Sequence, residues 1–126
     1  MKTISIMVVG IPSNTRDGYQ ALFAAIPELA ALSPADDTQS AIAKLRVLKP
    51  DLVVLDSSVS EGDADHIVSA IRQSSHAAKC LVICPTAEQS REMHGRGAVV
   101  AAVEGIPPAE LGAEVRRLAM HVQLET

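Results

Sequence analysis

The residue best placed to do chemistry in this chain is Asp56, which directly follows the apolar run Leu52-Val53-Val54-Leu55. Lys49-Pro50 and Ser57-Ser58 flank this segment. Four apolar residues are too few for a helix of ordinary length, and their bulk and β-branching favour a strand buried on both faces. In open α/β sheets, ligands bind at the carboxyl ends of the strands, where Asp56 would emerge. The acid is therefore a candidate functional group, although Asp is also common where a chain simply turns after a strand.

The cysteines, histidines and paired serines do not suggest a second centre of chemistry. On a strand, Cys80 and Cys84 would lie about 13 Å apart at roughly 3.3 Å per residue, which exceeds the reach of a disulfide. We expect them to be buried thiols of a reducing compartment. The histidines at positions 66, 76, 94 and 121 are too scattered to complete a zinc site. No histidine stands at a recognisable spacing from Ser57 and Ser58, so a hydrolase built on these serines is not expected.

Strand-like and helix-like segments alternate along the chain and predict the scaffold that positions Asp56. Strands are predicted at residues 4–9, 29–33, 52–55, 80–84 and 98–103. Helices are predicted from Ser13 or Asn14 to about Pro27, at 36–48, at 64–73, at 87–96, and from Pro108 or Ala109 onward. Residues 57–63 are predicted to be a polar loop. With right-handed crossovers, this alternation gives an α/β fold with a five-stranded, doubly wound parallel sheet and helices on both faces.

The composition limits the classes of partner. The 126 residues are predicted to form a single domain, 1–126, with an aliphatic core, because 48% are hydrophobic but there is only one Tyr, one Phe and no Trp. Few aromatic residues and a net charge of −4 argue against direct binding of nucleic acid. The first apolar run is much shorter than a membrane span or the core of a signal peptide, so we expect a cytoplasmic protein without membrane contact.

Several segments together resemble the receiver domain of two-component response regulators (CheY-like). Residues 43–56, AKLRVLKPDLVVLD, are close to the family pattern xLxPDLVLLD. Residues 19–29 resemble the first helix of receivers attached to helix-turn-helix output domains of the NarL/LuxR type, and residues 107–118 resemble the proline-led last helix. Gly97-Ala98 precedes the fifth strand as in the family. The resemblance covers nearly the whole chain and implies the flavodoxin-like strand order 2-1-3-4-5.

For Asp56, the resemblance implies the role of phosphoacceptor, which takes a phosphoryl group from a phosphohistidine of a sensor histidine kinase. Ordinary receivers support this transfer with Mg²⁺ held by two further acids at the end of the first strand, because a cation must spread the transition-state charge. The corresponding residues here are Gly10 and Ile11, which carry no acid. We therefore expect no cofactor, with Mg²⁺ as the one candidate that the family implies.

Two other family positions also depart from the pattern. The lysine that follows the fifth strand in the family corresponds to Glu104, so an anion stands where a cation normally neutralises the phosphoryl oxygens. The hydroxyl residue at the end of the fourth strand corresponds to Cys84 by strand length, or to Thr86 if the register is shifted by two. Cys84 could donate only a weak hydrogen bond to a phosphate.

Three interpretations of Asp56 remain open. It could be a working acceptor without the usual metal, a carboxylate that binds the loop amides near Ser57 and Ser58, or part of a site for a ligand other than phosphate. The function expected first is that of an atypical, non-enzymatic receiver domain that signals mainly by protein contact. The alternatives are a working phosphoacceptor fed by a partner kinase and a small-molecule-sensing pseudo-receiver. The resemblance also implies homodimers formed through the fourth helix, the fifth strand and the fifth helix, and a role in transcription regulation.

Overall fold

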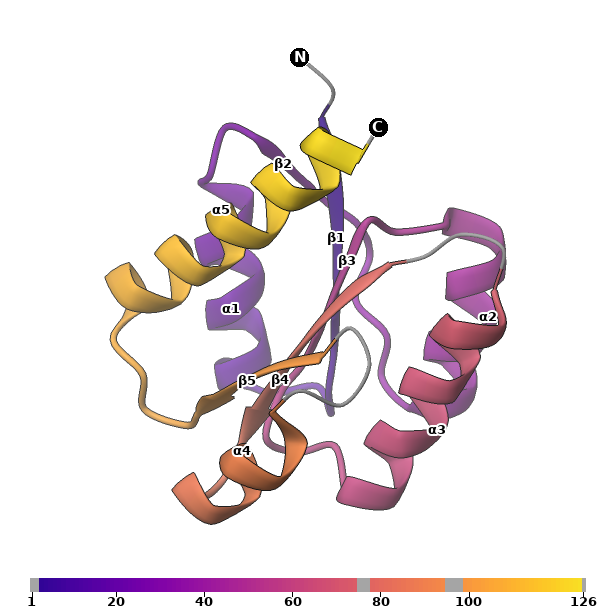
Figure 1. Ribbon diagram of the computed structural model, residues 1–126, viewed down its shortest axis with the longest axis vertical. Coiled ribbons are helices and arrows are strands. Elements are labelled where there is room, and N and C mark those ends of the chain that lie inside the picture. The colour runs from indigo at the N-terminus through magenta and orange to yellow at the C-terminus, as the bar shows by residue number, and fades with distance from the viewer. Residues whose placement is uncertain (1–2, 75–77, 95–98, 126) are drawn as a thin grey trace.

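The computed structural model describes residues 3–74, 78–94 and 99–125, and these form a parallel sheet covered by helices on both faces (Figure 1). The sheet has five strands in the order β2-β1-β3-β4-β5, as the resemblance implied. The strands are β1 (Ile4–Val9), β2 (Leu29–Ala31), β3 (Leu52–Leu55), β4 (Lys79–Cys84) and β5 (Val99–Val103). The helices are α1 (Asn14–Ala24), α2 (Thr38–Leu48), α3 (Glu61–Gln73), α4 (Ala87–Met93) and α5 (Pro108–Glu125).

The predicted central strand, β3, lies between β1 and β4, and all of its residues are buried. Its side chains alternate between the two faces of the sheet. Leu52 and Val54 pack in the core beneath α1 and α5, whereas Val53 and Leu55 pack in the core on the side of α2 and α3. Figure 1 shows these two helix pairs on opposite sides of the sheet. A strand covered on both faces needs an uninterrupted apolar run, which explains the sequence of β3.

Most of the predicted elements are confirmed, and the differences lie at their ends. β2 ends at Ala31 and not at residue 33, β4 begins at Lys79 and not at residue 80, and α2 begins at Thr38 and not at residue 36. α1 ends at Ala24, three residues before Pro27. α3 begins at Glu61 and not at residue 64, because the Ser60 side chain accepts the Asp63 N–H at 3.2 Å and caps the helix. The loop after Asp56 is therefore shorter than predicted. The predicted end of the fourth helix at residue 96, and Gly97-Ala98, lie outside the described residues.

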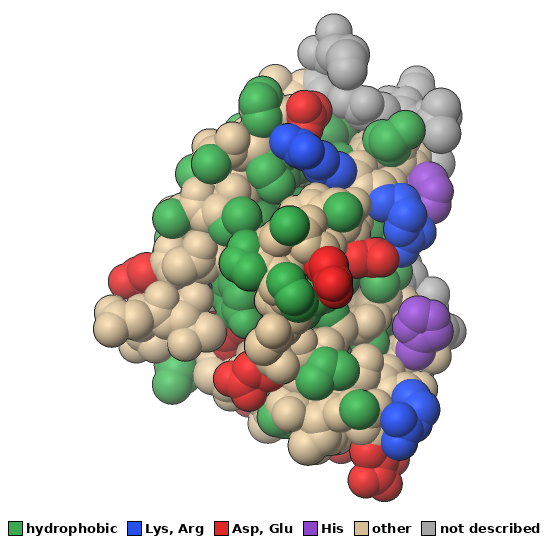
Figure 2. Space-filling view, turned by 90° about the vertical axis from the view of Figure 1, so that its left-hand side faces the viewer, with side chains coloured by type: hydrophobic (Ala, Val, Ile, Leu, Met, Phe, Trp, Pro, Cys, Tyr) green, Lys and Arg blue, Asp and Glu red, His purple; other side chains and the backbone are tan. Residues whose placement is uncertain are grey.

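The outer face of α1 and α5 carries scattered hydrophobic side chains between charged ones (Figure 2). A shallow groove of about 540 Å³ runs between these helices and is lined by Leu22, Ile26, Met120 and small residues of α5. Met120 is 61% exposed. Among the described residues, no helix combines the length and the apolar character needed to cross a membrane.

Candidate functional site

The candidate site lies at the carboxyl edge of the sheet, where the chain leaves β1 and β3 side by side. Val9 and Leu55 are register partners, so Gly10 and Asp56 follow neighbouring strands at the same level. The Asp56 N–H donates to the Val9 carbonyl at 2.9 Å, and the Gly10 N–H donates to the Ala35 carbonyl at 3.0 Å. The backbone therefore holds Asp56 directly beside Gly10.

The carboxylate of Asp56 is turned inward and bound by the loop that follows it. Asp56 is only 2% exposed. Its Oδ1 accepts the Ser58 N–H at 2.8 Å and also the Ser58 hydroxyl. The Ser58 Oγ in turn accepts the Ile11 N–H at 2.9 Å. The hydrogen bond from a loop amide to Asp56, which one sequence-based interpretation expected, is thus present at Ser58.

Gly10 provides the space that the Asp56 side chain occupies. A Cβ placed on Gly10 would lie 2.0 Å from Oδ2 and 2.3 Å from Cγ of Asp56, far inside van der Waals contact. Any side chain at position 10 would require Asp56 to move. Glycine at this position and an inward carboxylate at position 56 are consequently parts of one arrangement.

A buried cation, Arg16 of α1, binds the carbonyl of Gly10. Arg16 is 8% exposed, and its Nη1 donates to the Gly10 carbonyl at 3.1 Å and pairs with the Asp36 carboxylate. Sequence reasoning missed this residue. A cation in the first turn of a helix faces the positive end of the helix dipole, which is locally unfavourable, so its position already indicated a partner elsewhere in the fold.

The negative charge of the site affects the pKa of Tyr19, a second residue that sequence reasoning did not single out. Burial raises the pKa of the half-buried Tyr19 phenol, and the charges of Glu104 and Asp56 raise it further. Glu104 follows β5 directly, and its N–H donates to the Cys84 carbonyl at 2.8 Å. The anion predicted at the lysine position therefore lies at the same edge of the sheet as Asp56, and both act on the same phenol.

The two candidates for the switch hydroxyl have different surroundings. Cys84 is the last residue of β4 and is 3% exposed, and burial, followed by the charge of Glu61, raises the pKa of its thiol. Thr86 caps α4, where its hydroxyl accepts the Gln89 N–H at 3.2 Å. The assignment of the family's hydroxyl position to one or the other stays a prediction.

Mg²⁺ binds oxygen donors, and the residues around Asp56 offer these unevenly. Gly10 and Ile11 have no side-chain oxygen, and Oδ1 of Asp56 is already bound to Ser58. A hollow of about 120 Å³ beside them is lined in part by Asp36, Asp37 and Asp63. Across residues 3–74, 78–94 and 99–125, however, there is no group of three or more His, Cys, Asp or Glu side chains that could hold a metal ion. The absence of Mg²⁺ therefore stays a prediction, since this ion usually keeps several waters and needs only one or two carboxylates.

Comparison with solved structures places the fold among response-regulator receiver domains. A two-component response regulator of the LuxR family from Aurantimonas sp. SI85-9A1 is 25% identical, with 95% of this chain and 87% of that chain covered and a TM-score of 0.78. A CheY-like receiver domain protein from Methanospirillum hungatei JF-1 is 13% identical, with 99% and 100% covered and a TM-score of 0.80. The response regulator domain of Thermotoga maritima CheB is 15% identical, with 96% of each chain covered and a TM-score of 0.74. No protein-family model matches this sequence, and neither does any curated protein.

Proposed function

We propose that this chain is an atypical receiver domain that signals mainly by protein contact, and that Asp56 holds the crevice closed instead of accepting a phosphoryl group. The contact between Asp56 and Gly10 carries this proposal. The carboxylate fills the space above Gly10 and is 2% exposed, so an incoming phosphoryl donor has no approach to it in this conformation. In-line attack requires the nucleophile to face the donor.

The electrostatics of the crevice support the same proposal. Transfer between two anions requires a cation to spread the charge of the transition state. Gly10 and Ile11 offer no side-chain ligands to Mg²⁺, and Glu104 adds negative charge where the family has a lysine. Arg16 is the one buried cation among the described residues, but its Nη1 is already shared between the Gly10 carbonyl and the Asp36 carboxylate.

The hollow beside Asp56 is small for a ligand site. Its volume of about 120 Å³ compares with roughly 300 Å³ or more for typical small-molecule pockets. A pseudo-receiver that senses a small molecule in this crevice is thus less well supported than signalling by contact.

Partner binding is proposed for the face formed by α4, β5 and α5, with a second copy of the chain or another signalling protein, such as a sensor histidine kinase, as the partner. On α4, the side chains of Glu88, Arg91 and Glu92 are exposed and available for polar contacts. Receiver domains are in general signalling modules without enzymatic activity of their own, which agrees with this mode of action.

The test is an intact-mass and thermal-melt assay with acetyl phosphate, with and without Mg²⁺, on wild type and Asp56→Asn. A working receiver treated in parallel shows that the reagent is active, and Asp63→Asn serves as a matched variant with an exposed acid removed at the same edge. We expect no phosphate adduct on any form of this chain and no Mg²⁺-dependent shift in melting temperature. An adduct on wild type and Asp63→Asn that is absent from Asp56→Asn would show a working acceptor and refute the proposal.

A further inference from the structure

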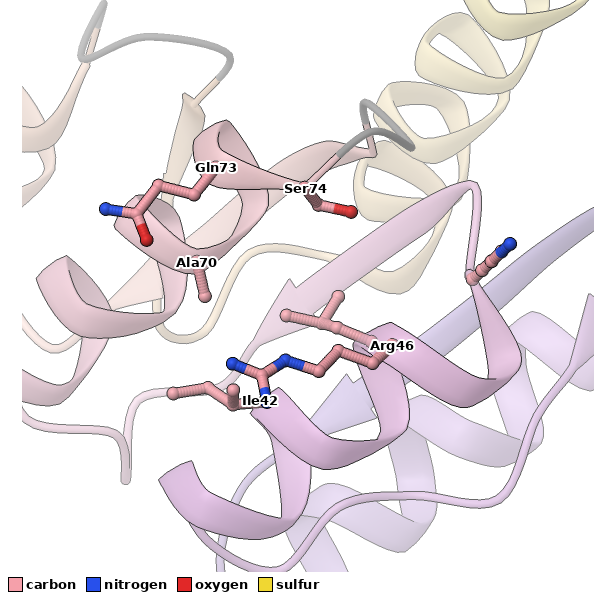
Figure 3. Close-up of a pocket in the computed structure, with 7 residues that line it drawn as sticks. Ile42, Arg46, Ala70, Gln73 and Ser74 are labelled. Atoms are coloured by element: carbon pink, nitrogen blue, oxygen red, sulfur yellow. The ribbon is translucent and has the colours of Figure 1, made fainter.

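A second hollow lies at the opposite edge of the sheet, between the last turns of α2 and α3 (Figure 3). α2 leads into the start of β3, and α3 leads into the start of β4, so this groove is remote from the carboxyl edge that holds Asp56. Its volume is about 360 Å³, which falls within the usual range of small-molecule pockets of roughly 300–1,000 Å³. It is lined by Ile42, Leu45, Arg46, Lys49, Ala70, Gln73 and Ser74.

Two cations line this groove on the side of α2. Arg46 is exposed in the last turn of α2, and Lys49 is the exposed residue that ends the helix. Neither side chain has a hydrogen bond or an ion pair within the part of the chain that the structure describes. In Figure 3 the Arg46 side chain extends along α2 toward Ile42, below Ala70 of the facing helix.

None of the residues that line the groove is acidic. Although the net charge is −4, the acid that follows α2, Asp51, is 7% exposed and accepts the Ser5 N–H at 3.0 Å and the Ser5 hydroxyl at 3.2 Å. Arg72, in the last turn of α3, is exposed but does not line the groove. The groove is therefore a local positive region on an acidic protein, which favours an anion.

The other walls of the groove determine what kind of anion would fit. Leu45 is buried, and Ile42 and Ala70 are partly buried, so together they form an apolar floor. Gln73 and Ser74 of α3 add hydrogen-bonding groups, and Figure 3 shows the Ser74 hydroxyl at the end of that helix. A pocket that combines an apolar floor with a few polar groups and a charge suits a ligand that has an apolar body and a charged or polar group.

From these features we propose that the groove between α2 and α3 is a binding site for a small organic anion, with its carboxylate or phosphate at Arg46 and Lys49 and its apolar body on the floor. This site is independent of the proposed role of Asp56. Cations at the end of a helix also stabilise the helix dipole, so the experiment must separate ligand binding from support of α2.

The experiment is an NMR titration of the ¹⁵N-labelled chain with sodium benzoate, benzamide and inorganic phosphate. Benzoate and benzamide have the same shape and differ in charge, whereas phosphate has the charge without the apolar body. We expect saturable amide shifts in residues 42–49 and 70–74 with benzoate, and binding at least about tenfold weaker with benzamide, because a charge-assisted hydrogen bond is lost. We expect phosphate to bind more weakly than benzoate. Equal binding of benzoate and benzamide, or no saturable shift with benzoate, would overturn the proposal.

Variants then assign the binding to the groove. Arg46→Gln combined with Lys49→Gln should weaken benzoate binding about tenfold or more. Arg72→Gln, which removes an exposed cation in the last turn of α3 that does not line the groove, should leave it unchanged. A double variant that melts at a lower temperature but keeps the wild-type affinity would mean that the cations only support α2, and would refute the site. If the double variant does not fold, Ala70→Leu provides the second test, since it fills the floor without changing the charge and should likewise abolish the shifts.

Discussion

The two buried carboxylates that flank β3 are bound in the same way but by different parts of the chain. Asp51, before the strand, accepts the N–H and the hydroxyl of Ser5, which lies 46 residues away on β1. Asp56, after the strand, accepts the N–H and the hydroxyl of Ser58, only two residues on. Asp51 is 7% exposed, and Asp56 is 2% exposed. Asp56, the acid that the sequence singled out for chemistry, is thus hydrogen-bonded like Asp51, but by a local loop.

This difference determines what each carboxylate can do. The Asp51 contact joins the residue before β3 to β1, next to the backbone hydrogen bond from the Asp51 N–H to the Ser5 carbonyl. The Asp56 contact involves an exposed loop residue, Ser58, and can open by a loop movement alone. Asp56 is therefore held closed by a few local interactions, and each of these can be removed by substitution.

Gly10→Ala should have the largest effect. The new Cβ would lie 2.0 Å from Asp56 Oδ2, so the carboxylate must leave its position and lose the bonds to Ser58. We expect a loss of about 3 kcal/mol in the free energy of unfolding, at the upper end for overpacked sites. Urea denaturation gives this value directly.

The matched control for Gly10→Ala is the same substitution in the Asp56→Ala background, where the opposing side chain is gone. The cost should then fall below about 1 kcal/mol, because contacting residues are strongly non-additive. Equal costs in both backgrounds would show that the two residues do not compete for the same space.

The next largest effect is expected for Asp51→Ala, compared with Asp56→Ala. Removal of Asp51 leaves the N–H and hydroxyl of Ser5 without their acceptor inside the sheet, at a cost of about 2 kcal/mol. Removal of Asp56 exposes the Ser58 N–H to water, which can replace the lost acceptor, so the cost should stay below about 1 kcal/mol. Melting curves of the two variants test the contrast, and the reverse order would contradict the distinction between a strand contact and a loop contact.

Much of this arrangement was accessible from the sequence, because its causes are local. The apolar run of β3 indicated a buried strand, and its carboxyl end placed Asp56 at the edge of the sheet. Gly10 and Glu104 were identified by their position after β1 and β5. The inward orientation of Asp56 could not be predicted, because it depends on the space above Gly10, which exists only once β1 and β3 are paired.

Arg16 and Tyr19 were missed for a related reason. Both lie on α1, and their roles depend on how that helix packs over the carboxyl edge of the sheet. Arg16 meets Asp36, 20 residues further along the chain, and Tyr19 experiences charges from Glu104 and Asp56. Helical periodicity identifies the buried side of α1, but it does not specify which loops that side will meet.

Ser58→Ala should have a smaller effect on stability and a clearer effect on access. The substitution removes one hydrogen bond to Asp56 and the acceptor of the Ile11 N–H, while the Ser58 N–H remains in place. We expect a loss of about 0.5 kcal/mol, together with faster amide hydrogen exchange at residues 10, 11 and 58. Ser57→Ala is the matched control and should leave exchange at these positions unchanged. Unaltered exchange in Ser58→Ala would show that its hydroxyl does not hold the crevice closed.

The smallest expected effect is on the titration of Tyr19, which can be followed alone because it is the only tyrosine and the chain has no tryptophan. Its pKa is raised above the ordinary value of 10.0 by burial first, then by Glu104, then by Asp56. In a spectrophotometric titration, Glu104→Gln should lower the pKa of Tyr19 more than Asp56→Asn does. Glu110→Gln, which removes an exposed acid of α5, should change it less than either. Because the folded state holds the phenolic proton more tightly than the unfolded chain, this contribution to stability is complete below pH 10.0 and is lost as the pH rises through the folded pKa. Identical titrations of wild type and Glu104→Gln would mean that the Glu104 carboxylate points away from the crevice. The proposal that Asp56 does not accept a phosphoryl group would then lose the electrostatic support of Glu104.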